Sequence, residues 1–352
     1  MVGAGTLDGL AALLSDHCPA SRFAVVADAA VAQLYGARVR NAAAELAPTD
    51  LLTFPAGEWN KSRESWAELT DQLLRRRFDR DGAILTLGGG VALDLGGFVA
   101  ATYQCGIRHV HLPTTLLAMV DGAIGGITGV DSPVGRDAIG SFHPPRVVVA
   151  DVATIETLPP VHVAAGMAPA TRLGLVADGE HLGWLTEHAT EIRARDHEVL
   201  EHAVHRSLEI ARDEHVRRER REGSPTEPGF GDPIAHALRT LLGYELLHGE
   251  SVALGMLAEA AIGNRIGVTA PEVVERIREA LVLFRLPDTP PSPVDASNVL
   301  DVLLPLDVAT TRCVRLALPE RIGTMAHDER GSATIPVEAT VIAEAIRGLG
   351  WL

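Results

Sequence analysis

The stretch that decides the fold is residues 88–103, which reads GGGVALDLGGFVAATY. The apolar run Ala83–Leu87 comes directly before it and predicts a buried strand, and its own small and apolar residues predict a helix to about Ala101. A strand that passes through Gly88-Gly89-Gly90 into a helix lets backbone N–H groups approach a phosphate-bearing ligand closely. The spacing is not G-x-G-x-x-G, so this turn alone is a weak signal that also fits tight packing.

Strands and helices alternate on both sides of this turn. Short apolar runs predict strands at Phe23–Ala27, Leu51–Phe54, His109–Leu112 and Val147–Ala150. Helical patterns lie between them, one ending near Leu46 and one spanning Ser62–Arg77. Alternation at this spacing predicts a parallel sheet with helices on both faces.

The pattern changes after Pro159-Pro160. From Val161 to about Arg285 it is helical nearly throughout, and the proline cluster Pro287–Pro293 then interrupts it. A strand at Cys313–Leu318 and a helix at Val337–Leu349 are expected to close the chain. We therefore predict two domains, an α/β domain at 1–158 and a mainly helical domain at 159–352.

Composition narrows the class of protein. The 352 residues are 47% hydrophobic and 22% charged, with a net charge of −15, which argues against nucleic-acid or membrane partners. No apolar run is long enough to span a bilayer, and the start of the chain lacks a signal-peptide pattern. Three widely spaced cysteines read as reduced thiols. We expect a cytoplasmic protein that acts on a small-molecule substrate.

The longer sequence context resembles the dehydroquinate synthase family of sugar phosphate cyclases. The motifs that carry the resemblance run from Gly57-Glu58-Trp59-Asn60-Lys61 to His248-Gly249-Glu250 and cover most of the chain. Between them lie the glycine turn, Pro113–Ala118, Asp121, Gly125-Gly126, Pro133–Gly140, Thr154–Pro159 and Ala165–Ala168. The resemblance implies a Rossmann-like N-terminal domain, a helical C-terminal domain and a homodimer.

The resemblance also implies an NAD site in the N-terminal domain. Glu58 would accept hydrogen bonds from ribose hydroxyls, Lys61 would place its ammonium near the ribose or phosphate, and N–H groups of the glycine turn would bind the pyrophosphate. Lys61 is the only lysine in the chain, which favours a role over the alternative of an exposed Glu58–Lys61 loop pair. The predicted cofactor-binding residues are Asp28, Glu58, Lys61, Gly89, Gly90, Val91, Asp94, Thr114, Thr115, Thr154, Thr157 and Leu158.

The family's zinc site is altered in this sequence. The family motifs G-L-A-E-x-x-K, G-H-T-x-G-H and H-G-E supply a glutamate and two histidines to the metal. Pro169 stands at the glutamate position and Asp232 at the first histidine position, whereas His248 is retained. Two weak candidate ligands, His248 and Asp232, fall short of the three that a catalytic zinc site requires. We therefore expect NAD without zinc.

The family's basic substrate-binding positions are also changed. Lysine positions read Ile127, Arg136 and Arg172, and an asparagine position reads Asp137. Changes are also expected around Pro225 and at Val308-Ala309. Because Ile127 removes a cation and Asp137 adds an anion, the usual doubly charged phosphate is disfavoured.

The family reaction oxidises a ring hydroxyl transiently with NAD, eliminates phosphate, returns the hydride and closes a carbocycle. Three functions remain open: an NAD-dependent enzyme acting on a polyol or cyclitol-like substrate, a sugar phosphate cyclase with a rebuilt site, and a catalytically silent NAD-binding subunit. The first is favoured, with the further prediction that the chain is not a genuine 3-dehydroquinate synthase. His236 is the predicted general base. Asp121, Arg136 and Arg172 would position the substrate, and His248 is either functional or a packed histidine.

Overall fold

The computed structural model describes residues 1–132, 135–220, 229–304 and 313–351, with the side chains of 135–138, 215–220 and Tyr244 left undescribed. The chain divides into two compact units, and each is described by itself. Unit 1 comprises Met1–Leu158 and Arg195–Leu208, and unit 2 comprises Pro159–Ala194 and Glu209–Leu352. Within the described residues, no helix is both long and apolar enough to cross a membrane.

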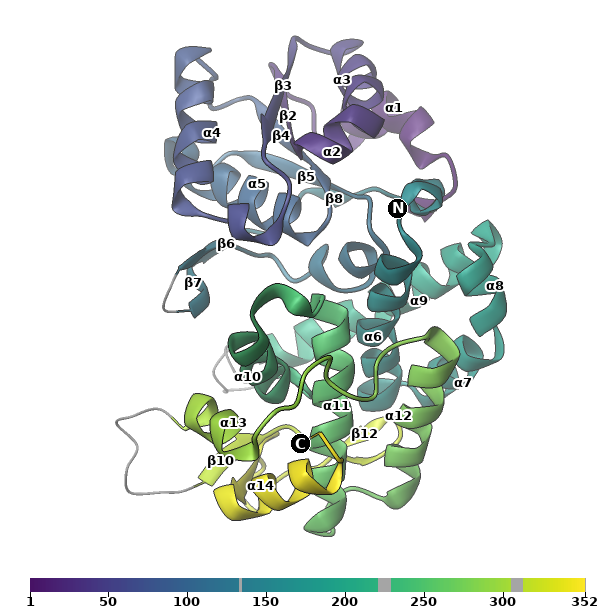
Figure 1. Cartoon of the computed structure of the whole chain (residues 1–352). Coiled ribbons are helices and arrows are strands. Elements are labelled where there is room, and N and C mark those ends of the chain that lie inside the picture. Colours follow the sequence, from purple (N-terminus) through teal and green to yellow (C-terminus); the bar gives the residue numbers. More distant parts are fainter. Residues whose placement is uncertain (133–134, 221–228, 305–312, 352) are drawn as a thin grey trace. The chain divides into compact units, whose positions relative to one another are not determined.

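Unit 1 is built on a five-stranded parallel sheet (Figure 1). The strand order is β3-β2-β4-β5-β8, so the chain runs from β2 out to the edge strand β3 and then crosses back past β2 to β4, β5 and β8. The strands are β2 (Phe23–Asp28), β3 (Thr49–Phe54), β4 (Ala83–Gly88), β5 (Arg108–Pro113) and β8 (Val147–Val148). The helices are α1 (Leu10–His17), α2 (Ala29–Val31), α3 (Ala37–Ala44), α4 (Arg63–Arg75) and α5 (Gly90–Thr102).

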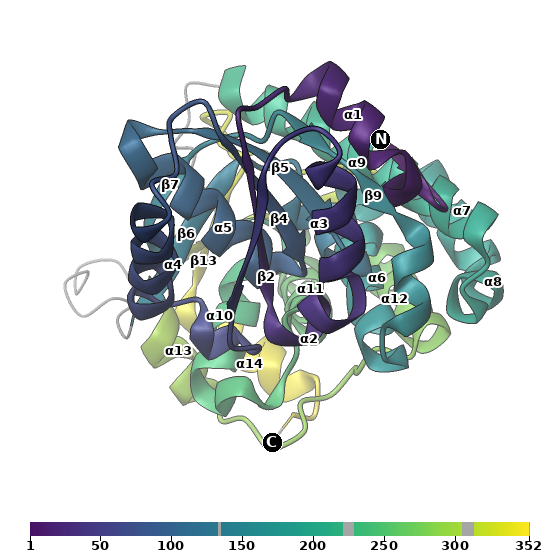
Figure 2. The same cartoon turned by 90° about the horizontal axis from the view of Figure 1, so that it is seen from above.

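Helices cover both faces of this sheet, as Figure 2 shows for α4 and α3. Alternate residues of a strand point to opposite faces, so Val26 packs with α4 and α5 while Val25 packs with α1 and α3. Both faces of β2 are therefore apolar and buried, which is why its sequence FAVVAD shows no polar alternation.

Two smaller pairings complete unit 1. Strand β1 (Val2–Gly3) pairs in parallel with β9 (Ala150–Asp151). Strands β6 (Ile127–Ser132) and β7 (Gly135–Phe142) form an antiparallel hairpin that the sequence pattern does not predict, because glycine, serine and aspartate interrupt the apolar alternation.

Three histidines pack together in unit 1 where α5 lies over β5. His109 is buried, its ring stacks on His143 at 5.0 Å, and His111 lies edge-on to it at 4.7 Å. Neither ring nitrogen of His109 has a hydrogen-bond partner in the described part of the chain. Burial lowers the pKa of His109 to about 2 and that of His111 to about 3, so both stay neutral near pH 7.

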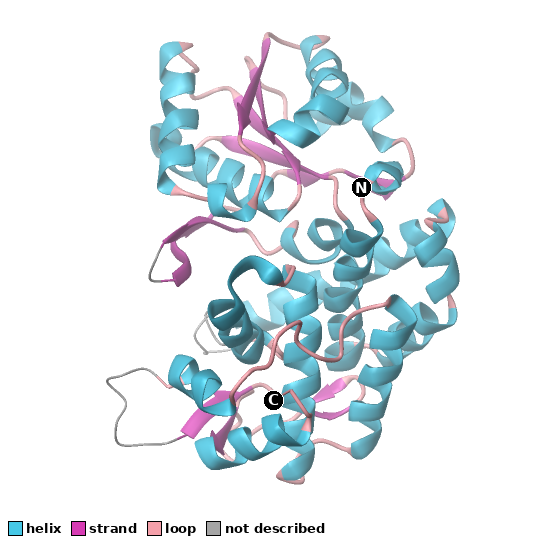
Figure 3. Cartoon of the chain, in the orientation of Figure 1, coloured by secondary structure: helices cyan, strands magenta, loops and turns pink. Residues whose placement is uncertain are grey.

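Unit 2 is mainly helical, as the cyan ribbons of Figure 3 show. Its helices are α6 (Pro160–Ala177), α7 (Gly179–Glu187), α8 (Ala189–Ala194), α10 (Asp232–Leu242), α11 (His248–Arg265), α12 (Pro271–Phe284), α13 (Ala296–Leu303) and α14 (Ala339–Gly348). Two antiparallel pairs join them, β10 (Cys313–Leu316) with β13 (Ile335–Glu338) and β11 (Pro319–Arg321) with β12 (Thr324–Met325). Helix α9 (His197–Arg220) begins in unit 1 and ends in unit 2.

The predicted fold class, a parallel-sheet α/β domain joined to a mainly helical domain, is confirmed. One local prediction is wrong. The helix expected from Val337 starts at Ala339, because Val337 and Glu338 belong to β13 and pair with Val314 and Cys313.

Candidate functional site

The start of α5 is an open helix N-terminus. Gly88 has φ +150°, and a Cβ there would lie 2.7 Å from Cβ of Ala92, so only glycine fits. Gly89 is the N-cap residue, and no side chain among the described residues caps the helix. A Cβ on Gly90 would meet nothing within 4 Å. The first N–H groups of α5 are thus accessible and carry the positive end of the helix dipole.

Other predicted cofactor residues lie at the same edge of the sheet. Asp28 ends β2, Gly88 ends β4, and the N–H of Thr114, just past β5, donates to the Gly88 carbonyl at 2.9 Å. The Asp28 carboxylate accepts hydrogen bonds from the N–H groups of Ala30 and Val31 at 2.9 and 3.0 Å. The carboxyl edge of a parallel sheet is the usual place for a ligand in this architecture.

The segment from Thr154 to Leu158 is held by its own hydrogen bonds. The Thr154 hydroxyl donates to the Asp151 carbonyl at 2.7 Å, and the Thr157 hydroxyl lies 2.8 Å from the Tyr35 hydroxyl. Tyr35 also donates to the Thr154 carbonyl at 3.2 Å. Sequence reasoning did not single out Tyr35, because a lone tyrosine in a helical stretch carries no spacing signal.

Lys61 is buried, with only 1% of its side chain exposed. Its Nζ lies 2.7 Å from Oδ2 of Asp94 and 3.7 Å from Oδ1 of Asp131, and its carbonyl accepts the Asp131 N–H at 2.8 Å. The alternative of an exposed Glu58–Lys61 pair is therefore wrong for the lysine. Lys61 joins its loop to α5 and to β6, and two predicted cofactor residues, Lys61 and Asp94, bind each other.

In unit 2, Arg172 and Asp232 form an ion pair between α6 and α10. Nη1 of Arg172 lies 2.7 Å from Oδ1 of Asp232, and the Gly229 N–H donates to Oδ2 at 3.1 Å. A Cβ on Gly229 would lie 2.5 Å from that oxygen, so the absence of a side chain there permits the contact. Both carboxylate oxygens of Asp232 thus have partners within the chain.

His236 and Arg239 continue one stripe along α10. Residues four and three apart on a helix share a face, so Asp232, His236 and Arg239 project to the same side. His236 is exposed, and Nη1 of Arg239 lies 3.3 Å from Nδ1 of His248 at the start of α11. Helix α10 therefore connects both α6 and α11 through charged or titratable side chains.

These residues do not fit the zinc site that the family resemblance implies. Pro169 lies inside α6 and its side chain has no donor atom. Asp232 is engaged by Arg172 and Gly229, which leaves His248 as the retained ligand. Among the described residues, no group of three or more histidine, cysteine, aspartate or glutamate side chains is arranged to hold a metal ion.

The candidates Asp121, Ile127, Arg136 and Asp137 belong to unit 1. Asp121 belongs to the helical turn Ala118–Gly122, and Ile127 opens β6 with 49% of its surface exposed. The backbone of Arg136 lies in β7, but its side chain is outside the described residues, as is that of Asp137. Pro225, Val308 and Ala309 also fall outside the described residues.

Comparison with known proteins identifies the family. The sequence model for the 3-dehydroquinate synthase N-terminal domain matches residues 51–165, and that for the C-terminal domain matches residues 166–306. The chain belongs to the 3-dehydroquinate synthase family. It is 41% identical over 301 residues to the 3-dehydroquinate synthase of Symbiobacterium thermophilum, covering 85% of this chain and 84% of the relative. It is 38% identical over 340 residues to that of Methylococcus capsulatus, covering 96% and 91%.

Solved structures support the same fold. A 2-deoxy-scyllo-inosose synthase complexed with carbaglucose-6-phosphate, NAD+ and Co2+ matches with a TM-score of 0.88 and 23% identity, over 98% of this chain and 95% of that one. The similarity extends through both units of the chain.

The prediction that this chain is not a genuine 3-dehydroquinate synthase is contradicted. Relatives that carry that name are 35–41% identical over most of the chain. The prediction depended on a few side chains, chiefly Pro169 and Asp232. The similarity to 3-dehydroquinate synthases extends over about 300 positions in both domains.

Proposed function

We propose that this chain is an NAD-dependent sugar phosphate cyclase of the 3-dehydroquinate synthase type, in which the Arg172–Asp232 ion pair takes the place of a metal centre. The uncapped start of α5 is the observation that carries the NAD part of the proposal. It offers N–H donors to a pyrophosphate at the carboxyl edge of the sheet. The name 3-dehydroquinate synthase of the chain's relatives and the NAD+ in the similar inosose synthase structure also support an NAD-dependent cyclase.

In this proposal NAD, held by the open start of α5, would supply reversible hydride transfer at a substrate carbinol carbon. His236 accepts the hydroxyl proton as general base, because it is exposed on α10 and its ring makes no hydrogen bond within the described part of the chain. The Arg172 guanidinium stabilises negative charge on the substrate oxygen. Asp232 fixes the orientation of that guanidinium through the 2.7 Å contact.

The direct test is turnover with the heptulosonate phosphate substrate of dehydroquinate synthases. Protein dialysed against a chelator should release phosphate from it in the presence of NAD. His236→Gln should lower kcat by about 100-fold, the lower range for loss of a general base. Calorimetry should detect NAD binding to the dialysed protein. An empty dinucleotide site in calorimetry would remove the basis of the proposal.

The metal-independent part has its own test. The double variant Pro169→Glu, Asp232→His adds two family ligands beside His248 and should gain stoichiometric zinc, measured by mass spectrometry of dialysed protein. The unmodified chain should retain none. If the unmodified chain holds one zinc, and His248→Ala releases it, the ion pair has not replaced the metal.

A polyol or cyclitol-like substrate is the second candidate. Ile127, 49% exposed where the family has a lysine, favours it, since an apolar side chain does not bind a phosphate. Reduction of NAD by such polyols, with no phosphate release from the heptulosonate phosphate, would favour it over the cyclase. NAD binding with neither signal would indicate a silent cofactor-binding subunit.

A further inference from the structure

Glu259 is a fully buried acid within an otherwise apolar stretch of α11. Its exposed fraction is 0%, and its neighbours along the helix include Leu257, Ala258 and Ala260, which are also buried. Burial raises the pKa of its carboxyl well above the ordinary value, while hydrogen bonds from backbone N–H groups act in the opposite direction. A buried carboxyl is costly unless its oxygens have partners, so its contacts show what it does.

Both oxygens of Glu259 bind the start of α10. Oε2 accepts the Gly231 N–H at 2.8 Å, and Oε1 accepts the Ile234 N–H at 3.3 Å. These residues lie on either side of Asp232. The first turn of a helix has N–H groups without partners inside the helix, and here the carboxyl group of Glu259, from another helix, accepts hydrogen bonds from two N–H groups at this end.

The two helices approach closely at the same point. A Cβ on Gly255 would lie 2.1 Å from the Gly231 carbonyl oxygen. The backbones of α11 and of the start of α10 therefore touch directly, which only a glycine at position 255 allows. Gly231 has φ +88°, and a Cβ on it would lie 2.9 Å from Cγ of Met256. The backbone on which Asp232 sits is therefore fixed by sterics as well as by Glu259.

We infer that Glu259 is a positioning residue, which orients Asp232 and His236 by holding the first turn of α10 against α11. The inference rests on the proposed function, because it gives Glu259 a role in positioning the side chains of α10 that the proposed function uses. Glu259 acts through the backbone of Gly231 and Ile234, then through Asp232, whose carboxylate holds Arg172. An Asp232 displaced from its place would release both Arg172 and the Gly229 N–H.

Amide hydrogen exchange tests this inference without any need for turnover. Glu259→Gln keeps the side-chain volume but replaces one acceptor oxygen with a donor group. Exchange at Gly231, Ile234 and Gly229 should become at least about tenfold faster, the Gly229 N–H reporting on Asp232. If Gly229 remains protected while the other two accelerate, Asp232 does not depend on Glu259 and the inference is wrong.

A matched control separates positioning from general loss of stability. Asp295 caps α13 in the same unit, its Oδ1 accepting the Ser297 N–H at 2.8 Å. Asp295→Ala should leave exchange at Gly229 and Gly231 unchanged. Glu259→Asp, which is one methylene shorter, provides a second test should the glutamine variant not fold, and it should also accelerate exchange at Gly229.

Kinetics give the functional half of the test. Glu259→Gln should lower kcat by at least about tenfold and leave KM for NAD and its Kd unchanged, because the predicted cofactor residues all lie in unit 1. Equal kcat for Glu259→Gln and the unmodified chain would overturn the inference. If the unmodified chain shows no turnover with any substrate, the proposed function fails, and the exchange at Gly229 alone decides the role of Glu259.

Discussion

Two helix starts in this chain treat the same electrostatic problem in opposite ways. At α5 the first N–H groups follow Gly89, and in the described part of the chain no side chain caps them and the space around Gly90 is open. At α10 a buried carboxyl group from α11, that of Glu259, binds two of the N–H groups, and Asp232 adds an acidic side chain in the first turn. Both ends attract negative charge. The start of α5 leaves room for an anionic ligand, whereas the start of α10 is bound by acidic side chains of the chain itself.

The difference agrees with the proposed function, in which the open start of α5 receives a ligand and the enclosed start of α10 belongs to the scaffold. Small residues at an open N-terminus suit an anion that comes and goes, such as a pyrophosphate. Acidic side chains at an enclosed N-terminus fix the backbone and repel a further anion. In this chain His236 and Asp232 lie on α10, the helix with the enclosed start. We therefore assign to Glu259 the role of fixing their positions.

The sharpest way to break this comparison is to fill the open helix start. Gly90→Asp places a carboxylate where we propose the pyrophosphate binds, and like charges about 4 Å apart near a surface cost about 4 kcal/mol. NAD affinity in calorimetry should fall by about 1,000-fold. Thermal stability should hold, because an acidic residue in the first turn favours the helix.

Gly90→Ala is the matched control for that variant. A Cβ at this position meets nothing within 4 Å, so the alanine chain should fold and bind NAD within a few-fold of the unmodified chain. Equal affinities for the aspartate and alanine variants would place the dinucleotide elsewhere.

Acid should affect the two units with opposite sign. The folded pKa values of His109 and His111, about 2 and about 3, lie below the ordinary value of 6.5. Below pH 6.5 the unfolded chain therefore binds protons that the folded chain does not, and stability is lost as pH falls. From pH 6.5 to 5.0 the two histidines together should cost unit 1 about 3 kcal/mol.

Glu259 makes unit 2 respond in the other direction. Its folded pKa is raised, so its contribution to stability is present at acid pH and is lost as pH rises through that value. Hydrogen exchange at pH 5.0 and 6.5 should show unit 1 opening more readily at pH 5.0, and His109→Leu should halve the effect. A pH-independent unit 1 in exchange would contradict the burial of these rings.

Substitution of Lys61 tests whether its ion pair with Asp94 of α5 stabilises unit 1. Lys61→Met leaves Asp94 and Asp131 without their shared cation. Because these carboxylates are 25% and 20% exposed, solvent screens part of the repulsion, and we expect a loss of about 2 kcal/mol in urea unfolding. Adding Asp131→Asn should recover part of the loss. An unchanged free energy of unfolding, with NAD affinity lost, would make Lys61 a direct cofactor ligand instead.

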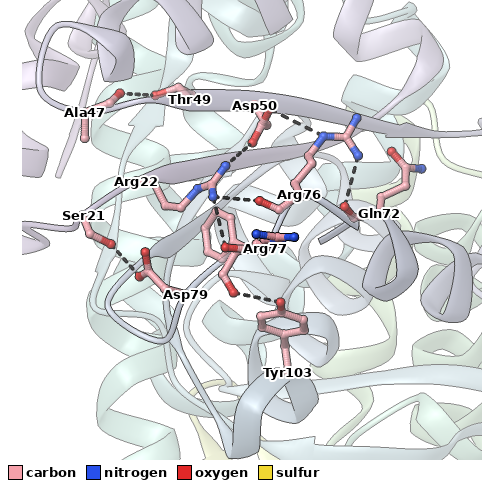
Figure 4. Close-up of polar contacts among 11 residues, drawn as sticks. Ser21, Arg22, Ala47, Thr49, Asp50, Gln72, Arg76, Arg77, Asp79 and Tyr103 are labelled. Atoms are coloured by element: carbon pink, nitrogen blue, oxygen red, sulfur yellow. Dashed lines mark hydrogen bonds and ion pairs between the residues drawn. The ribbon is translucent and has the colours of Figure 1, made fainter. Parts of the chain in front are cut away.

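The smallest effect on NAD affinity is expected at the opposite edge of the sheet, where the strands begin. Side chains cover this edge. Arg22 donates to the carbonyls of Arg76 and Arg77 at 3.0 and 3.3 Å, pairs with Asp50 at 2.9 Å and lies over the Phe78 ring (Figure 4). Arg22→Met should cost about 1 kcal/mol in urea unfolding, the net value of a few such bonds. NAD affinity should stay within twofold, and a larger change would mean that the two edges are coupled.

Strands with continuous apolar runs were predictable from sequence, and contacts that depend on three-dimensional packing were not. The segment Ala83–Gly90 predicts strand β4, the start of helix α5 and its open N-terminus. These features depend on the local residue pattern and on the conformational freedom of glycine. The β6–β7 hairpin was missed, since glycines 129 and 140 pack backbone against backbone and leave no alternation to read.

The candidate site divides in the same way. Sequence placed Asp232 and Arg172 at altered family positions, but their ion pair requires α6 and α10 to be neighbours. Glu259 is detectable in the sequence as a lone acid in the run Val252–Ile262. Such an acid is read as exposed until the helix is known to be buried on all sides.

The path of α9 has a practical consequence for anyone who dissects this protein. Leu200, Ala203 and Val204 are buried and belong to unit 1, although they follow the first three helices of unit 2 in the chain. A fragment that stops at Leu158 would therefore lack part of its own apolar interior, and a chimera joined there would inherit a foreign half of one continuous helix. The two units of this chain are not interchangeable modules, and a transplant of unit 1 would have to carry residues 195–208 together with residues 1–158.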